Sequence, residues 1–138
     1  MNASPHILLV EDDTLDVMIF KRALKRAGFE HTLHLAQDGQ EALSLLKSDA
    51  LPQPPDVILM DLNMPRMGGL ECLAQIRQDE ALSHLSVFIF TTSAASEDLD
   101  EAYKLHAAGY IVKEGEITQS VQVAQLLDLY ARLNCTQN

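Results

Sequence analysis

The stretch Val57-Ile58-Leu59-Met60-Asp61-Leu62-Asn63-Met64-Pro65 decides the fold of this chain. Its first four residues are apolar and lie between Pro54-Pro55 and Pro65, which is typical of a short strand buried on both faces of a parallel sheet. In open sheets of parallel strands, the ligand crevice lies beyond the carboxyl ends of the strands. Because Asp61 follows the run directly, we expect its carboxylate at the mouth of such a crevice.

A second apolar run, Ile7-Leu8-Leu9-Val10, is followed in the same way by the acidic group Glu11-Asp12-Asp13. Two strand ends would then direct several carboxylates, including Asp61, toward one point. Such a cluster repels itself unless a cation or a proton lies in it, and a set of oxygen ligands selects a hard ion, Mg²⁺ foremost. The sequence therefore predicts a magnesium site at this edge of the sheet.

Two further strand ends carry polar groups that suit a phosphoryl group. Val87–Phe90 runs into Thr91, and Gly109–Val112 runs into Lys113. A metal ion and the lysine would neutralise phosphoryl charge, the hydroxyl would donate a hydrogen bond, and Asp61 would act as a carboxylate nucleophile. One such residue alone is typical of an ordinary cap or turn, but four in register favour a functional site.

The whole chain reads as five repeats of a strand followed by a helix. We expect strands near 6–10, 32–36, 56–60, 86–91 and 109–112, and helices near 14–28, 39–48, 68–79, 96–107 and 117–134. This alternation predicts an α/β fold, flavodoxin-like and doubly wound (βα)5, with a parallel sheet in the order 2-1-3-4-5. Residues 1–138 are expected to form a single domain with no output domain. Gly28 is the expected cap at the end of the first helix, and Ser96 the expected cap at the start of the fourth.

At this point the chain resembles a known family, the receiver domains of two-component response regulators. The resemblance runs from Ile7 to about Leu133. It is carried by an acidic pair, a turn with two glycines after it, and three single residues: Val10-Glu11-Asp12, Asp61-Leu62-Asn63-Met64-Pro65 with Gly68-Gly69, Thr91, Tyr110 and Lys113.

The resemblance assigns each of these residues an expected role. It implies that Asp61 is the phosphoacceptor and that Thr91 and Lys113 bind the phosphoryl group. Asp12 is then a direct Mg²⁺ ligand, Glu11 its outer-shell partner, and Asn63 a ligand through its backbone carbonyl. Tyr110 is the aromatic switch. A sensor histidine kinase would be the donor. The implied protein is a signalling protein with self-catalysed phosphoryl transfer and slow autodephosphorylation.

One departure from the family pattern lies directly after Lys113. Most members have a proline there, in a cis peptide bond, whereas this chain has Glu114-Gly115. A cis bond without proline costs about 2.5–4 kcal/mol more than a trans bond, so we expect a trans bond or a softer loop here. This departure, with Thr91-Thr92-Ser93 and Pro52-Gln53-Pro54-Pro55, is similar to the stand-alone regulators paired with bacterial phytochrome histidine kinases.

Composition restricts the partners and the location. No run approaches 18 apolar residues, and the first five residues lack a signal-peptide pattern, so we expect a cytoplasmic protein without membrane contact. Cys72 and Cys135 lack the spacing of a metal or redox pair and are expected to be free thiols. The net charge of −10 argues against nucleic-acid binding. We therefore expect protein partners.

The last helix allows two interpretations. Val123, Leu126, Leu127 and Tyr130 form one stripe that should cover the sheet, while Leu129 and Leu133 widen the apolar arc. The surplus is either part of a broad core stripe or a face for a homodimer formed by this helix and the strand at 109–112.

Other functions remain as alternatives. A phosphatase with an aspartyl nucleophile typically has a second acid two residues later as general acid, where this chain has Asn63, which cannot transfer that proton. A flavodoxin-type protein shares the expected topology, but its flavin phosphate would be repelled by Glu11-Asp12-Asp13. A phosphate sink or a non-signalling interaction module is the third alternative. The five histidines are scattered along the sequence and do not predict a zinc site.

Overall fold

The computed structural model describes residues 4–134 and contains five strands that alternate with five helices. The strands are β1 (His6–Val10), β2 (Thr32–Ala36), β3 (Val57–Met60), β4 (Val87–Thr91) and β5 (Gly109–Val112). The helices are α1 (Thr14–Ala27), α2 (Gly39–Lys47), α3 (Gly69–Gln78), α4 (Ser96–Lys104) and α5 (Ile117–Leu133).

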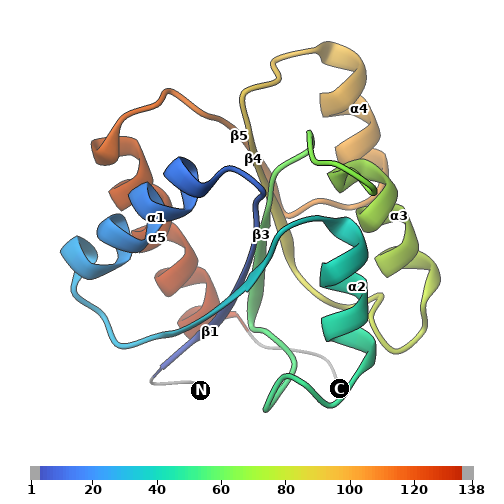
Figure 1. The fold of residues 1–138 in the computed structure, drawn as a ribbon, viewed down its shortest axis with the longest axis horizontal. Helices are drawn as coiled ribbons and strands as arrows, with labels where there is room; N and C mark the ends of the chain where they lie inside the picture. The colour runs from blue at the N-terminus through green and yellow to red at the C-terminus, as the bar shows by residue number, and fades with distance from the viewer. Residues whose placement is uncertain (1–3, 135–138) are drawn as a thin grey trace.

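The strands form one parallel sheet in the order β2-β1-β3-β4-β5. Helices α1 and α5 cover one face of the sheet, and α2, α3 and α4 cover the other (Figure 1). This arrangement confirms the predicted flavodoxin-like α/β fold and its strand order.

The central strands β1 and β3 contribute to a core on each face. Ile7 and Leu59 pack on the side of α1 and α5, while Leu8 and Ile58 pack on the opposite side. All four are completely buried. Burial on both faces explains why these strands are continuous apolar runs rather than alternating sequences.

The capping predictions succeed at α1 and fail at α4. Gly28 follows α1, and its N–H donates to the Leu24 carbonyl at 3.2 Å, as expected for a C-cap. Ser96, in contrast, is already the first helical residue of α4. Ser93 lies where it can stabilise this end, since its hydroxyl donates to the Asp98 carboxylate at 2.6 Å and accepts from the Ala95 N–H at 3.3 Å.

Helix α5 buries less of its apolar surface than the sequence predicts. Val123 and Leu127 are buried, as expected, but Leu126 is 41% exposed. Leu126 is therefore exposed on the same side of the helix as Leu129 and Leu133, which are 50% and 75% exposed. We call these three residues the outer stripe of α5. Their spacing of three and four positions places them along one side of the helix.

Two further features concern the composition. No helix within residues 4–134 is both long and apolar enough to cross a membrane. Cys72 is a buried free thiol, and Cys135 lies outside the described residues.

Candidate functional site

The acidic groups meet because β1 and β3 are neighbours in register. Val10 lies opposite Met60, the last residue of β3. The backbone pairing continues one step further, since the Asp61 N–H donates to the Val10 carbonyl at 3.0 Å. Glu11 and Asp61 therefore leave the same edge of the sheet side by side.

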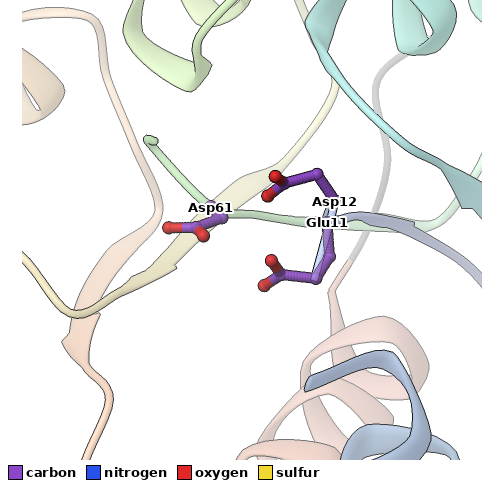
Figure 2. A group of neighbouring side chains, drawn as sticks. All are labelled: Glu11, Asp12 and Asp61. Carbon is purple, nitrogen blue, oxygen red and sulfur yellow. The ribbon is translucent and has the colours of Figure 1, made fainter. Parts of the chain in front are cut away.

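Three carboxylates form a compact cluster at this edge. One oxygen from each of Glu11, Asp12 and Asp61 lies within 4.8 Å of the other two. Figure 2 shows Glu11 and Asp12 extending from the end of β1 toward the side where Asp61 lies. Glu11 is buried, Asp12 is exposed and Asp61 is half-buried, so the cluster opens to solvent at one end. An oxygen-only set of this kind fits a hard divalent cation.

Lys113 reaches into this cluster from the end of β5. Its Nζ lies 2.5 Å from Glu11 Oε1, 2.9 Å from Asp16 Oδ2 and 3.5 Å from Asp61 Oδ2. The side chain is only 8% exposed. Because residues 4–134 contain no cis peptide bond, the predicted trans bond between Lys113 and Glu114 is confirmed.

Burial and the contact between Glu11 and Lys113 have opposite effects on the pKa values of these two residues. Burial raises the pKa of Glu11 to about 7, although the hydrogen bond from Lys113 works against the shift. Burial alone would lower the pKa of Lys113, but the hydrogen bonds with Glu11 and Asp16 more than offset it and raise that pKa above its usual range. Lys113 is therefore a firmly charged ammonium next to Asp61 at neutral pH.

Thr91 and Tyr110 connect the ends of β4 and β5. Thr91 is completely buried at the end of β4, and its carbonyl accepts a hydrogen bond from the Lys113 N–H at 2.7 Å. The Tyr110 hydroxyl donates to the Ser93 carbonyl in the following loop at 2.9 Å. The predicted hydroxyl, aromatic and lysine positions thus share one network of contacts.

The loop after Asp61 carries Asn63 and is held closely to the strand. The Leu62 N–H donates to Asp61 Oδ1 at 2.7 Å, and the Gly69 N–H donates to the Leu62 carbonyl at 2.9 Å. A Cβ atom at Gly69 would lie only 2.2 Å from the Asp61 carbonyl, so the return of the chain requires glycine. Asn63 itself is exposed within this loop.

A second contact ties the same loop to α2. Asp38 is completely buried, precedes α2, and accepts from the Glu41 N–H at 2.9 Å. It also accepts from Arg66 Nε at 2.7 Å. The hydrogen bond from the Glu41 N–H, more than the guanidinium of Arg66, holds the pKa of Asp38 below its usual value. Arg66 adopts a left-handed backbone conformation with φ of 62°.

The sequence reasoning missed several of these residues. Asp16 lies in the first turn of the helix that follows Glu11-Asp12-Asp13, which could have indicated that it belongs to the site. The Arg66–Asp38 contact joins residues 28 positions apart and has no sequence signal. His6 Nδ1 and His34 Nε2 also come within 3.3 Å, on the neighbouring strands β1 and β2. They belong to no group of three metal-ligating residues within 4–134.

Comparison with known proteins agrees with this geometry. The response regulator receiver domain family matches residues 7–125. Response regulator Rcp1 from Synechocystis sp. is 32% identical over 127 residues, which cover 90% of this chain and 86% of Rcp1. The crystal structure of the phosphorylated cyanobacterial phytochrome response regulator RcpA has a TM-score of 0.85 at 32% identity and covers 97% of this chain and 98% of RcpA. The Mn²⁺-bound form of Rcp1 has a TM-score of 0.83 at 29% identity and covers 97% of this chain and 99% of that structure.

The chain belongs to the response regulator receiver domain family. Within this family it is similar to the phytochrome-associated regulators, which confirms the narrower resemblance predicted from the sequence.

Proposed function

We propose that this protein is a phosphoacceptor response regulator that receives a phosphoryl group from a partner histidine kinase on Asp61. The observation that carries the proposal is the cluster of Glu11, Asp12 and Asp61 within 4.8 Å, with the Lys113 ammonium 3.5 Å from Asp61. A nucleophilic carboxylate and fixed positive charge beside it are the parts that phosphoryl transfer requires.

The roles of the individual side chains follow from their positions. An Asp61 carboxylate oxygen forms the new bond to phosphorus while the bond to the donor nitrogen breaks. Lys113 offsets charge on the transferred group, and the Thr91 hydroxyl at the end of β4 donates to one of its oxygens. Asp12, Asp61 and the Asn63 carbonyl would hold Mg²⁺ directly, and Glu11 would stand behind them. The ion supplies further charge neutralisation when it is bound.

The oxygen chemistry of the cluster supports Mg²⁺ as the metal. Carboxylate and carbonyl oxygens suit Mg²⁺, Ca²⁺ or Mn²⁺ rather than zinc or copper. Mg²⁺ commonly binds through one or two carboxylates and the phosphate of the substrate, with several waters retained. The cluster of three acids is partly exposed, so waters and a phosphate can complete the coordination of the ion, as Mg²⁺ sites commonly require.

A bacterial phytochrome is the class of kinase that we propose as the donor. The support is the similarity to Rcp1 and to the phytochrome response regulator RcpA over almost the whole chain. The sequence Lys113-Glu114, which lacks the proline that most family members have, agrees with the resemblance drawn from the sequence. Such a partnership would place the protein in the cytoplasm.

We also propose that the protein forms a homodimer through the outer stripe of α5 and the neighbouring β5. Val112 at the end of β5 is 39% exposed, and Leu126, Leu129 and Leu133 are exposed along α5. A second copy is the occupant that we favour, because a stripe without charged side chains suits a self-complementary two-fold contact.

A phosphatase-like enzyme is the rival function. It would use the same nucleophile but release phosphate repeatedly, and the second residue after Asp61 is Asn63, which cannot serve as a general acid. Radiolabelled acetyl phosphate with Mg²⁺ distinguishes the two functions. A response regulator takes up about one label per chain and loses it slowly after the donor is removed. Continuous phosphate release in large excess over protein would instead support the phosphatase.

A further inference from the structure

We propose that Gln119 and Asp16 are positioning residues for Lys113, and that Gln119 holds in this chain the loop that the family's proline holds elsewhere. The inference rests on the proposed function, because Lys113 matters only if a phosphoryl group arrives at Asp61. It assigns a role to two residues that the family motif does not contain.

The backbone around Lys113 needs an external support. The Lys113 N–H is held by the Thr91 carbonyl at 2.7 Å, but the next three residues, Glu114 to Glu116, are exposed and precede α5. Gly115 adopts φ of 77°, a conformation that turns the chain sharply. Without proline, the covalent structure of Glu114 does not restrict this turn.

Gln119 supplies that support from the first turn of α5. Its Nε2 donates to the Val112 carbonyl at 2.7 Å, and its Oε1 accepts from the Glu114 N–H at 2.8 Å. The Val112 carbonyl belongs to the peptide unit before Lys113, and the Glu114 N–H belongs to the unit after it. One side chain therefore fixes both peptide planes that flank Lys113. This needs a donor and an acceptor in one group, which among side chains of this length only glutamine provides in a planar amide.

Asp16 and Glu11 share the other end of the lysine, where Glu11 Oε1 lies 2.5 Å from Lys113 Nζ. Asp16 Oδ2 lies 2.9 Å from Lys113 Nζ, closer than Asp61 at 3.5 Å. Asp16 is not one of the three clustered carboxylates, although it binds the same ammonium as Glu11 and Asp61. It draws the ammonium toward α1 and away from Asp61. A small cavity of about 30 Å³ is lined by Asp16, Lys113 and Gln119 among others, so the three side chains border one space.

The two residues therefore act in opposite senses on the same lysine. Gln119 keeps the backbone of Lys113 at the site. Asp16 pairs with the Lys113 ammonium until phosphoryl oxygens compete for that ammonium. Loss of Gln119 should slow phosphorylation, whereas loss of the Asp16 charge should speed it. A purely structural role would make both losses harmful.

Phosphorylation by acetyl phosphate at saturating Mg²⁺ tests this inference. We expect Gln119→Met to lower the rate constant about fivefold, the effect of losing a typical hydrogen bond, with an unchanged dissociation constant for Mg²⁺. The matched control is Gln125→Met, an exposed glutamine on the same helix. We expect the phosphorylation rate constant of Asp16→Asn to be about threefold higher than that of Asp13→Asn. A factor of this size corresponds to the loss of a half-exposed ion pair. Asp13→Asn removes the same charge nearby, and asparagine still caps α1.

A second measurement does not depend on any variant folding. Hydrogen exchange of the Glu114 N–H in the unaltered protein should be slowed at least about tenfold relative to an unstructured amide, although Glu114 is exposed. The proposal is wrong if that amide exchanges freely, if Gln119→Met reacts as fast as Gln125→Met, or if Asp16→Asn reacts no faster than Asp13→Asn. An unaltered protein that takes up no phosphoryl group overturns the proposed function instead, and Glu114 protection then still decides whether Gln119 holds this loop.

Discussion

At the scale of single residues, the site is a problem of charge balance. Glu11, Asp12 and Asp61 lie together, and Asp16 is bound to the same lysine. One ammonium offsets only part of this negative charge. Burial removes water from the Glu11 carboxylate and raises its pKa to about 7. Binding of a divalent cation relieves the repulsion and favours the ionised carboxylates.

The first prediction concerns Lys113 itself. Lys113→Ala should leave Mg²⁺ binding intact or tighten it, because the change removes a positive charge from the metal site. It should weaken the phosphorylation-dependent conformational change, since the phosphoryl group loses a charge-assisted hydrogen bond of about 1.5–3 kcal/mol. Calorimetric Mg²⁺ titration and the NMR shift of Tyr110 on phosphorylation provide the two readouts. A normal Tyr110 response in Lys113→Ala would remove Lys113 from the proposed mechanism.

The second prediction concerns the pair formed by His34 and His6. Burial, followed by the charge of His6, lowers the pKa of His34 in the folded protein. Between that lowered pKa and the ordinary value of about 6.5, the unfolded chain binds more protons than the folded one, so the free energy of unfolding rises with pH there. It should decline as the pH falls below about 6.5, and His34→Gln should reduce this decline. Urea unfolding at several pH values measures both slopes, and equal slopes would contradict the account.

The sequence could predict the residues at strand ends but not their side-chain partners. Asp61, Glu11 and Lys113 each follow an apolar run, so the pattern located them and the family resemblance suggested roles. The contact between Asp16 and Lys113 joins positions 97 apart and depends on how α1 packs against α5. No local pattern encodes that distance.

At the scale of elements, the loop after Asp61 is fixed by a helix that contributes nothing to the chemistry. Asp38 binds both the first turn of α2 and the side chain of Arg66. The left-handed conformation of Arg66 persists because that contact and the Met67 N–H bond to the Pro65 carbonyl hold it. The position of Asn63 therefore depends on α2.

The third prediction follows from this contact. Asp38→Ala removes the N-cap of α2 and the buried partner of Arg66, and should lower the free energy of unfolding by about 2 kcal/mol, the upper part of the range for capping residues. Urea denaturation measures the change. Asp100→Ala, at an exposed position on α4, is the control and should have little effect. A loss at Asp38 no larger than that of the control would show that α2 does not depend on this cap.

Element ends and exposed faces were the less predictable part of the fold. The α4 helix stops at Lys104, earlier than expected, because His106 takes a left-handed φ of 57° and the Ala107 N–H bonds to the Ala102 carbonyl. Leu126 is exposed because α5 packs on the sheet and on α1 through Val123 and Leu127. Helical periodicity shows an apolar arc but not which edge of it faces the core.

At the scale of the whole molecule, the outer stripe of α5 offers a way for the signal to leave the domain. Tyr110 on β5 bonds to the loop after β4, and Val112, two residues further along the same strand, is exposed. Phosphorylation that repositions Thr91 and Tyr110 can therefore change the surface beside α5. A population shift of this kind requires only that one state be favoured by a few kcal/mol.

The fourth prediction is that the protein dimerises through this surface. The double substitution Leu129→Asp with Leu133→Asp should convert the dimer to a monomer, because it places charges in the centre of an apolar interface. Sedimentation at about tens of micromolar, a usual range for weak dimers, measures the change. Leu15→Asp, at an exposed position on α1, is the control. A monomer in the unaltered protein with and without phosphorylation, or a dimer that survives the double substitution, would contradict the prediction.

The measurement that tests the central claim most directly is the intact mass of the protein after incubation with acetyl phosphate and Mg²⁺, compared with Asp61→Asn. The cluster of Glu11, Asp12 and Asp61 repels an anionic donor unless a divalent ion is bound. The account predicts the added mass of a single phosphoryl group in the unaltered protein, no addition when the metal is chelated, and no addition in Asp61→Asn. Undiminished, acid-stable labelling of Asp61→Asn would show that the phosphoryl group goes elsewhere.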